Sequence, residues 1–408
     1  INGGGLKFDY FSPNEKHRFN VFASAQHINR DSYYGGGQDP NAYGNTTDLN
    51  WMAGSQYVYS FGKCIFMPAD LTAGIEFNQD KLEDNMWGYH RTVDQKVNIG
   101  SAFFQNEWKN EHWGFLIGGR LDKHNLIDHV IFSPRANLRY NPTENINLRF
   151  SYSSGFRAPQ AFDEDLHVKN VGGNVAMVEL ADNLKEERSQ SLSASADIYH
   201  RFGAFQVNFL VEGFYTKLSD VFALTDGEVV DGILTRTRYN APGARVMGLT
   251  LEGKMAYLTK FQVQAGVTLQ QSHYSEPHVW NKEAPAVKKM MRTPNTYGYF
   301  TATYTPIKPL SIALSGTYTG SMLVPHEPVP GFLEKPITVN TKDFFDIGLK
   351  AAYDFKLYKS MNLQVNAGVQ NIFNAYQNDF DKGADRDSGY IYGPSLPRSF
   401  FAGVKISY

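Results

Sequence analysis

The sequence has almost no cysteine, no long apolar run and little net charge. Its 408 residues include a single cysteine, Cys64, so no intrachain disulfide can form and the redox compartment cannot be inferred. No stretch reaches the ~18 consecutive apolar residues that a membrane-spanning helix needs, which excludes a helical membrane protein. The formal net charge of −2 offers no electrostatic basis for nucleic-acid binding, and we predict none.

The start of the chain also lacks expected features. It begins at Ile1 rather than at a methionine, and no signal peptide opens it. Because Ile1 falls in the middle of a repeating pattern, we expect this sequence to be part of a longer protein.

Aromatic residues and glycine are abundant instead. The aromatic share is 14%, with 24 Tyr and 29 Phe, and 36 residues are glycine. This composition suits aromatic girdles at membrane interfaces joined by tight turns. It suits a large soluble β-sandwich equally, so composition indicates β structure without choosing its surroundings.

The last segment of the chain alternates strictly in character. One set of positions is apolar and the other is mostly small or polar: Phe400, Ala402, Val404, Ile406 and Tyr408 against Phe401, Gly403, Lys405 and Ser407. A strand that ends a protein leaves one edge uncovered, so it must pair with another strand or promote aggregation. Closing a barrel solves this problem, and an apolar face directed into lipid makes it a membrane barrel.

The same alternation recurs along the whole chain. Residues 146–152, 261–269 and 363–369 are examples among about 17 segments of roughly 9–14 residues, the length at which a tilted strand crosses a bilayer. No stretch shows a sustained helical period with capping signals, so we expect negligible helix. The sequence predicts an all-β protein, a transmembrane antiparallel up-and-down β-barrel.

The connections between these segments support a barrel over other all-β folds. Through the second half of the chain, short connections such as Leu258–Lys260 take turns with long ones such as Ser321–Lys342 and Tyr376–Pro397. Outer-membrane barrels show this pattern, with short periplasmic turns and long extracellular loops. A soluble sandwich rarely keeps it, and a β-propeller would show a blade repeat that is missing. The polar second face could not fill a dry core, but it could line a wide lumen.

Four motifs, in this order, resemble one family. They are SYSSGFRAPQAFDEDL, LKEERSQSLSASADIY, RYNAPGARVMGLTLEG and the final pair VQNIFNAYQNDFD with YGPSLPRSFFAGVKISY, at Ser151–Leu166, Leu184–Tyr199, Arg238–Gly253 and Val369–Tyr408. Together they are similar to the strand and loop motifs of TonB-dependent outer-membrane receptors, at least from Asn141 to Tyr408. Two positions depart from the family pattern: Glu186 stands where proline is usual, and Tyr408 where phenylalanine is commoner.

The resemblance implies a barrel of about 22 strands with an N-terminal plug domain. Residues 1–408 would then be the transmembrane barrel domain with about 17 of those strands, and the plug and the first strands would lie upstream. It also implies the bacterial outer membrane as location, contact with its lipid, and the TonB–ExbB–ExbD complex as a partner through the missing plug region.

The implied function is active import of a scarce, bulky metal chelate: iron-siderophore, haem or cobalamin. A surface lipoprotein that caps the loops is a further expected partner for a large ligand. The alternative is a passive porin-like barrel, or a barrel for ligand binding or adhesion. The motifs G-x-S-x-G, H-E-x-x-H and G-x-x-x-x-G-K-[ST] are missing, so we expect no enzyme and no resident cofactor.

Loop residues are the candidates for ligand binding. Aromatic and arginine side chains suit a large, flat, partly apolar ligand, although packing within loops and girdles explains single aromatics equally well. The candidates in the expected loops are Tyr33, Tyr34, Trp87, Tyr89, His90, Arg91, His278, Trp280 and Arg292.

Two further candidates involve metal. His167 lies in the interval that, in haem receptors of the resembled family, holds an axial haem ligand; the alternative is a surface histidine without such a role. Carboxylates alternate with other residues in an acidic loop that could hold calcium, or that could be tied by salt bridges to Arg386 and Arg398. They are Asp379, Asp381, Asp385 and Asp387.

Overall fold

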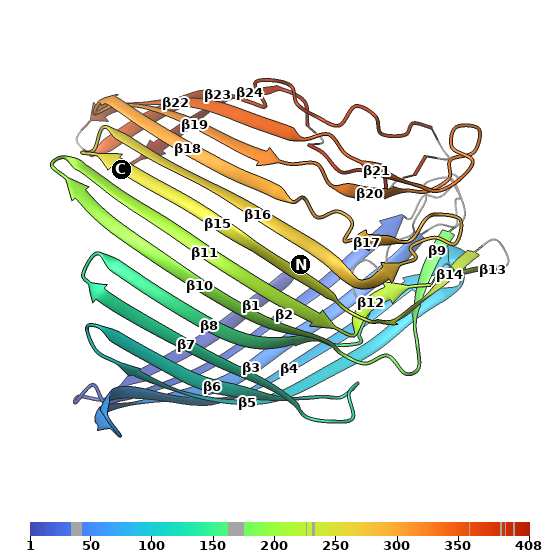
Figure 1. The fold of residues 1–408 in the computed structure, drawn as a ribbon, viewed down its shortest axis with the longest axis horizontal. Coiled ribbons are helices and arrows are strands. Elements are labelled where there is room, and N and C mark those ends of the chain that lie inside the picture. Colours follow the sequence, from blue (N-terminus) through green and yellow to red (C-terminus); the bar gives the residue numbers. More distant parts are fainter. Residues whose placement is uncertain are drawn as a thin grey trace.

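The computed structural model contains one large, curved, antiparallel sheet (Figure 1). The structure describes residues 1–33, 43–161, 175–225, 227–230, 233–358, 360–383, 386–387, 389–394 and 396–408. The large sheet has 18 strands, of which one, β17, is a three-residue flap on β16, so 18 − 1 = 17 strands form the wall.

Each wall strand pairs with the next in antiparallel register. Their bounds are β1 (Asn2–Phe11), β2 (His17–Tyr33), β3 (Tyr43–Cys64), β4 (Met67–Met86), β5 (Arg91–Lys109), β6 (Trp113–His124), β7 (Ile131–Thr143), β8 (Ile146–Arg157), β10 (Glu187–Phe202), β11 (Phe205–Ser219), β15 (Ala244–Tyr257), β16 (Phe261–His278), β18 (Thr296–Ile307), β19 (Leu310–Thr319), β22 (Phe344–Tyr358), β23 (Met361–Gln370) and β24 (Ser399–Ser407). The predicted all-β meander and its number of strands are confirmed.

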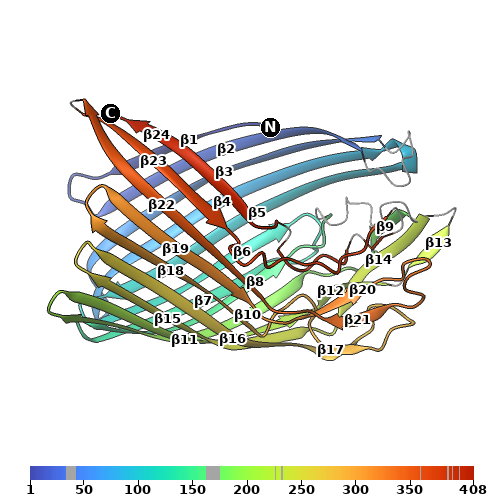
Figure 2. The ribbon, with the colours of Figure 1, turned by 90° about the horizontal axis from the view of Figure 1, so that it is seen from above.

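Some strands are longer than the sequence predicted. β3, β4 and β5 contain 22, 20 and 19 residues, and all three project beyond their neighbours at one end (Figure 2). Arg91, expected in a loop, therefore lies in β5, and the connection between β4 and β5 is only the 3-10 turn η2 (Trp87–Tyr89) and His90. The strand tips are polar on both faces, because water surrounds them and neither face needs to be apolar. They therefore lack the alternation of apolar and polar residues that predicts a strand.

The remaining strands are small and belong to the long connections. β9 (Val175–Leu180) runs parallel to β14 (Ile233–Ala241), which also pairs with β12 (Val221–Leu224) and β13 (Glu228–Val230). The others are β17 (Val287–Lys289) and the pair β20 (Leu323–His326) and β21 (Ile337–Asn340). In the part of the chain with described structure, no α-helix occurs, and no helix is long and apolar enough to span a membrane.

The connections separate cleanly between the two ends of the sheet (Figure 1). Short turns such as Ile65–Phe66 and Gly203–Ala204 lie at one end, the turn end, and the long connections lie at the other, the loop end. Within the wall, register shifts occur only beside turns, between Phe61 and Cys64, for example, or at the loop-end tip of β16. The middle of every wall pairing is therefore uninterrupted.

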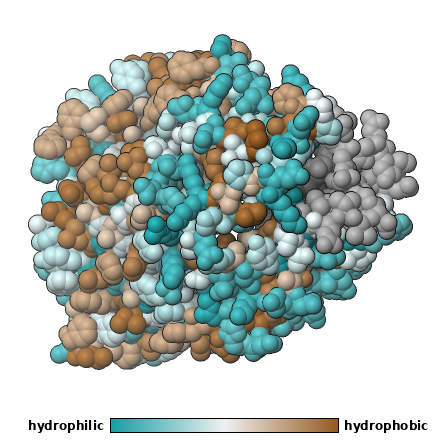
Figure 3. Space-filling model, turned by 45° about the vertical axis from the view of Figure 1, so that its right-hand side comes forward, coloured by the Kyte–Doolittle hydropathy of each residue, from teal (hydrophilic) through white to brown (hydrophobic). Residues whose placement is uncertain are grey.

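The pleat gives the wall two different faces. Cross-strand partners such as Val365 and Val404, or Leu314 and Leu349, place apolar side chains on the outer face. The positions between them carry polar groups such as Gln364 on the inner face. Brown, hydrophobic surface lies over much of the strand region, and teal surface concentrates towards the loop end (Figure 3). This arrangement fits a sheet with lipid outside and a wet lumen inside.

The two outermost strands bound the open side of the curved sheet (Figures 1 and 2). Among the residues the structure describes, β1 pairs only with β2 and β24 only with β23. The expectation that further strands and a plug complete the barrel stays a prediction.

Glycines on the lumenal face make room for aromatic rings from neighbouring strands. A Cβ on Gly74 would lie 2.4 Å from the Phe103 ring and 2.6 Å from the Ser55 carbonyl oxygen. Gly54 and Phe22, Gly248 and Phe214, Gly266 and Tyr299, and Gly368 and Phe401 repeat the arrangement. These pairs place apolar rings on the polar face while excluding a side chain beneath each one.

Replacing one of these glycines should destabilise the wall. We expect Gly74→Val to lower the unfolding free energy by about 1–3 kcal/mol, because the added side chain overpacks against Phe103 and the backbone. Chemical unfolding of the purified protein in detergent measures this change in unfolding free energy. Gly100→Val is the matched control, since a Cβ on Gly100 meets nothing within 4 Å. Equal losses in both variants would contradict the explanation.

Candidate functional site

The candidate residues gather at the loop end, where they form two groups. The first lies at the tips of β2–β5. The rings of Tyr33 and Tyr43 pack across the strands with centroids 5.0 Å apart, and Trp87 is 59% exposed. His90 takes a left-handed φ of 50° that ends η2, and its N–H donates to the Trp87 carbonyl. Trp87 is thereby held at an exposed tip.

Arg91 joins this tip to the connection between β8 and β10. Its Nη2 donates to the Val178 carbonyl at 2.6 Å, which ties β5 to β9 over 87 residues of sequence. Three candidates cannot be placed here: Tyr34, His167 and the side chain of Tyr89 lie outside the described part of the molecule. Their proposed roles stay predictions.

The second group lies in the connections between β16 and β24. His278 packs against Tyr274 with ring centroids 4.7 Å apart, and burial lowers the pKa of the His278 imidazole. Trp280 is only 8% exposed, and its Nε1 has no hydrogen-bond partner among the residues described. A buried indole N–H without an acceptor leaves one donor available to a ligand or a bound water.

Arg292 fastens two loops together. It adopts a left-handed φ of 56°, and its Nη1 donates to the Ile391 carbonyl at 2.8 Å while Nη2 donates to the Gly389 carbonyl. The guanidinium of Arg292 is therefore already engaged by backbone oxygens of the connection that contains the acidic residues.

The acidic residues lie in a compact cluster that we call the loop hub: His326, Asp379, Asp381, Asp387, Tyr390 and Tyr392. His326 Nε2 lies 2.9 Å from Asp381 Oδ2, and its ring stacks on Tyr390 at 3.8 Å with an interplanar angle of 5°. Both members of the His326–Asp381 pair are buried. The hub joins the β19–β22 connection to the β23–β24 connection.

Protein donors satisfy the hub carboxylates. The Tyr392 hydroxyl donates to Asp379 at 2.6 Å, and burial together with this carboxylate raises the pKa of Tyr392 above its ordinary value. Asp387 accepts from the Glu327 and Gly389 backbone N–H groups at 2.9 and 2.8 Å. The predicted salt bridges to Arg386 and Arg398 are not formed by the described carboxylates; Arg386 donates to the Gly383 carbonyl instead.

The calcium prediction concerns the carboxylates of this loop. Where structure is described, no group of three or more His, Cys, Asp or Glu side chains could hold a metal ion. Asp385, the fourth predicted carboxylate, lies outside that part. Calcium at this loop stays a prediction.

Sequence reasoning missed several residues that organise the loop end. Glu327 accepts from Arg236 Nη2 at 3.2 Å and from Asn281 Nδ2 at 3.1 Å. It therefore joins the β11–β15, β16–β18 and β19–β22 connections. Arg236 is mostly buried, and its Nε has no partner in the described structure. No periodic pattern in the sequence marks such buried charged residues. Only the contacts in the folded structure identify them.

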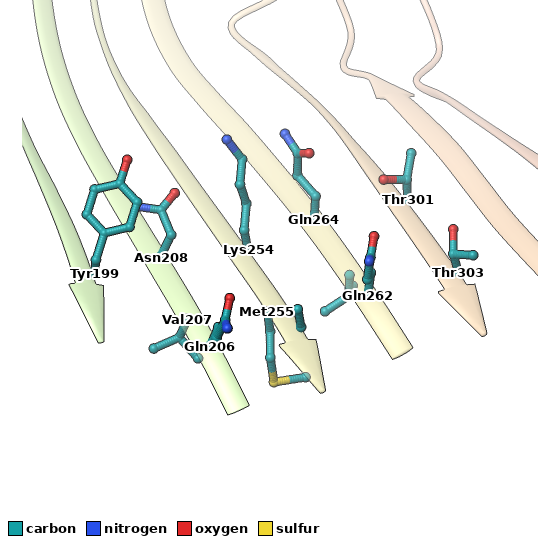
Figure 4. Close-up of a pocket in the computed structure, with 12 residues that line it drawn as sticks. Tyr199, Gln206, Val207, Asn208, Lys254, Met255, Gln262, Gln264, Thr301 and Thr303 are labelled. Carbon is teal, nitrogen blue, oxygen red and sulfur yellow. The ribbon is translucent and has the colours of Figure 1, made fainter. Parts of the chain in front are cut away.

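The lumenal wall below the loops is lined by polar side chains. Tyr199, Asn208, Lys254 and Gln264 point to the same side of four neighbouring strands, whereas Val207 and Met255 point to the other (Figure 4). All six residues are among those that line a hollow of about 340 Å³ in this part of the wall. Glu252 accepts from Lys254 at 2.7 Å, and Gln264 donates to the Tyr299 hydroxyl at 2.6 Å. The lumen wall is therefore a hydrogen-bonded polar surface.

Comparison with known families identifies this architecture. The family model described as TonB dependent receptor-like, beta-barrel, matches residues 2–372. The chain belongs to this family. The match reaches further towards the N-terminus than the motif resemblance, which began at Asn141. Receptor barrels of this family lie in the bacterial outer membrane and are transport receptors rather than enzymes, as predicted.

Solved structures of receptors share the fold of this TonB-dependent receptor barrel. They include a mutant of the ferric enterobactin receptor PfeA from Pseudomonas aeruginosa (TM-score 0.72, 16% identity, covering 99% of this chain and 61% of that one). The siderophore receptor PirA from Acinetobacter baumannii has a TM-score of 0.70 and 15% identity, with 98% of this chain and 61% of that one covered. The ferric-catecholate import receptor Fiu from E. coli has a TM-score of 0.69 and 15% identity, with 98% of this chain and 63% of that one covered.

This receptor barrel spans less than two thirds of the length of these structures. At such low identity the likeness establishes the fold alone. A sequence search of curated proteins found no match.

The loop hub should hold the receptor's long connections together. We expect His326→Phe to keep the stacking on Tyr390 but to remove the imidazole partner of the buried Asp381 carboxylate, which then keeps, among the described residues, only the hydrogen bond from the Asp387 backbone N–H at 3.1 Å. This loss should cost about 1–3 kcal/mol. Limited proteolysis should then cut residues 320–343 about ten-fold faster. His112→Phe, in a turn at the opposite end, is the control. Unchanged cleavage of the hub variant would show that the pair does not restrain the loops.

A second cluster concerns Glu186, which departs from the family's usual proline. Its buried carboxylate lies 2.7 Å from Arg188 and 2.9 Å from His129 Nε2. Burial opposes ionisation, but the hydrogen bonds from Arg188 and His129 outweigh it and lower the pKa of Glu186 below its ordinary 4.5. The lowered pKa means that the carboxylate stabilises the fold above about pH 4.5 and that this contribution is lost as the pH falls further.

Glu186→Gln should therefore destabilise the receptor at pH 7 by about 1 kcal/mol, and this difference should shrink as the pH falls below about 4.5. Thermal unfolding measured across this pH range tests the expectation. Glu144→Gln, in an exposed turn, should show no such pH-dependent difference. A loss for Glu186→Gln that is constant with pH would rule out ionisation as the cause.

Proposed function

We propose that this chain forms the barrel wall of a receptor that imports an anionic iron chelate across the outer membrane with energy supplied through TonB. The observation that carries the proposal is the family match across residues 2–372. Receptors of this family work with TonB, and three receptors of similar fold are named as a ferric enterobactin receptor, a siderophore receptor and a ferric-catecholate import receptor.

The geometry of the loop end supports capture of a large ligand there. Trp87 is exposed at the tip of the longest strands, and Trp280 carries a buried indole N–H without a partner in the described structure. Several long connections are joined to one another, by Arg292, by Glu327 and by the loop hub. Rigid walls with aromatic and polar groups at their rim suit recognition of a bulky chelate.

The lumenal wall supports an anionic cargo. Arg139 and Arg149 are direct cross-strand partners on the lumenal face of β7 and β8, and Arg135 lies on the same face of β7. None of the three forms an ion pair with a described carboxylate; Arg139 donates to backbone carbonyls and Arg149 to Asn147. Cations placed directly opposite each other favour an anion between them.

The choice among chelates follows from this charge. An anionic iron-siderophore is favoured over haem and cobalamin, because it uses the lumenal arginines and does not require an axial ligand. His167 as a haem ligand remains open as a second candidate. A passive porin-like or adhesion barrel predicts neither a dependence on TonB nor saturable chelate binding. A surface lipoprotein cap and a TonB–ExbB–ExbD contact through a plug remain proposals of the same kind.

Purified complete receptor should bind a ferric catecholate with saturable quenching of tryptophan fluorescence. We expect Trp280→Phe and Trp87→Phe to reduce the quenching amplitude, because both indoles lie at the loop end. Trp113→Phe, beside a turn at the opposite end, is the matched control and should leave it unchanged. Haem and cobalamin are tested in parallel, haem by the shift of its Soret band.

The outcomes separate the functional classes. If haem binding shifts the Soret band and His167→Ala abolishes the shift, the ligand is haem rather than a siderophore. If the receptor retains cobalamin, the ligand is cobalamin. Uptake of the chelate by cells without TonB, at an unchanged rate, would overturn active import in favour of a passive barrel.

A further inference from the structure

A row of basic side chains crosses the outer face of the wall at the loop end. Lys217 on β11 is the direct cross-strand partner of Arg245 on β15, which is in turn the partner of His273 on β16. His273 is the partner of Lys289 on β17. We call these four residues the basic row; they occupy adjacent strands at one level of the sheet.

The pleat directs the basic row outwards, towards lipid. Tyr215 and Met247 are direct cross-strand partners with exposed side chains on the outer face. Lys217 lies two positions beyond Tyr215 on β11, and Arg245 lies two positions from Met247 on β15, so both are on the same face. Two residues of strand correspond to about 7 Å along the wall. The basic row therefore lies just beyond the apolar band, at the level of the lipid headgroups on the loop side.

The row lacks an internal counter-charge. Among the ion pairs of the described structure, none involves Lys217, Arg245 or Lys289. The neighbouring Arg188 shows the contrast, because Glu186 neutralises it at 2.7 Å. Like charges placed directly opposite each other on a sheet are destabilising. A row of three cations and one histidine would be costly to maintain unless an anion lies against it.

We propose that the basic row binds the phosphate groups of an anionic lipid headgroup in the outer leaflet. The chemistry fits each position: the Arg245 guanidinium can bind phosphate in a bidentate manner, and Lys217 and Lys289 supply point charges on either side. The acyl chains of the same lipid would lie along the outer face below, over Tyr215, Met247 and Leu249. Clustered basic residues at a membrane interface recognise phosphorylated headgroups in this way.

The position favours a lipid over a soluble anion. The cations continue directly into exposed apolar surface, so one molecule with both a phosphate head and acyl chains contacts both. A free phosphate would use only the row. This inference does not depend on which chelate the receptor transports, since the row lies on the face opposite the lumen.

The test compares lipid retention by purified complete receptor and by two triple variants. One is Lys217→Gln/Arg245→Gln/Lys289→Gln; the matched control removes the same charge from the lumenal face, Lys350→Gln/Lys356→Gln/Lys405→Gln. Each protein is incubated in detergent with diphosphorylated lipid A, and bound lipid is counted by native mass spectrometry. We expect affinity to fall roughly five-fold for each cation removed, about 100-fold in the basic-row variant, and to stay unchanged in the control.

Two comparison ligands complete the experiment. Dephosphorylated lipid A should bind no better to the wild type than to the basic-row variant, and inorganic phosphate should compete only weakly. Equal lipid retention by wild type and basic-row variant would overturn the proposal. So would full displacement by equimolar inorganic phosphate, which would indicate a site for a free anion. Unchanged unfolding temperatures for both triple variants confirm that loss of binding is not loss of fold.

Discussion

The cross-strand hydrogen bond is the constraint on which the whole structure depends. Lipid offers no partner for a backbone N–H or C=O, so every such group at membrane depth must be paired by a neighbouring strand. This explains why the register of each wall pairing runs unbroken through its middle, as between Arg188 and Phe202 with β11. It also explains why the register shifts between Phe61 and Cys64 and between Tyr304 and Ile307 lie beside turns, where water replaces the missing bonds.

Once the ladder is imposed, the pleat divides the side chains between two solvents. The lipid side tolerates almost any apolar residue, whereas the lumenal side must satisfy polar groups without a packed core. The molecule does this with short networks such as Glu252, Lys254 and Tyr299, and with aromatic rings laid over glycines of the next strand. The inner surface is thereby hydrogen-bonded without a packed core beneath it.

The sequence predicted the wall well because its signal is local. A period of two in segments such as 363–369 reports the pleat directly, and the alternation of short and long connections reports the two ends. The loops were predicted poorly because their contacts are not local. His326 and Asp381 are 55 residues apart, and Arg292 and Gly389 are 97 apart, so nothing in the surrounding sequence indicates that they meet. The strand tips near Met86 were missed for a different reason: they pair in water, where the apolar alternation is not required.

The joined connections have a consequence for how such a receptor can change its specificity. Arg292, Glu327 and the loop hub join the connections after β11, β16, β19 and β23 to one another, and in each contact the two partners belong to different connections. A loop transplanted alone from a homologue would bring one half of each contact and leave a buried charge in the host without its counterpart. Diversification at this rim is therefore expected to proceed by exchange of whole sets of loops, with the four connections inherited together as one evolutionary unit.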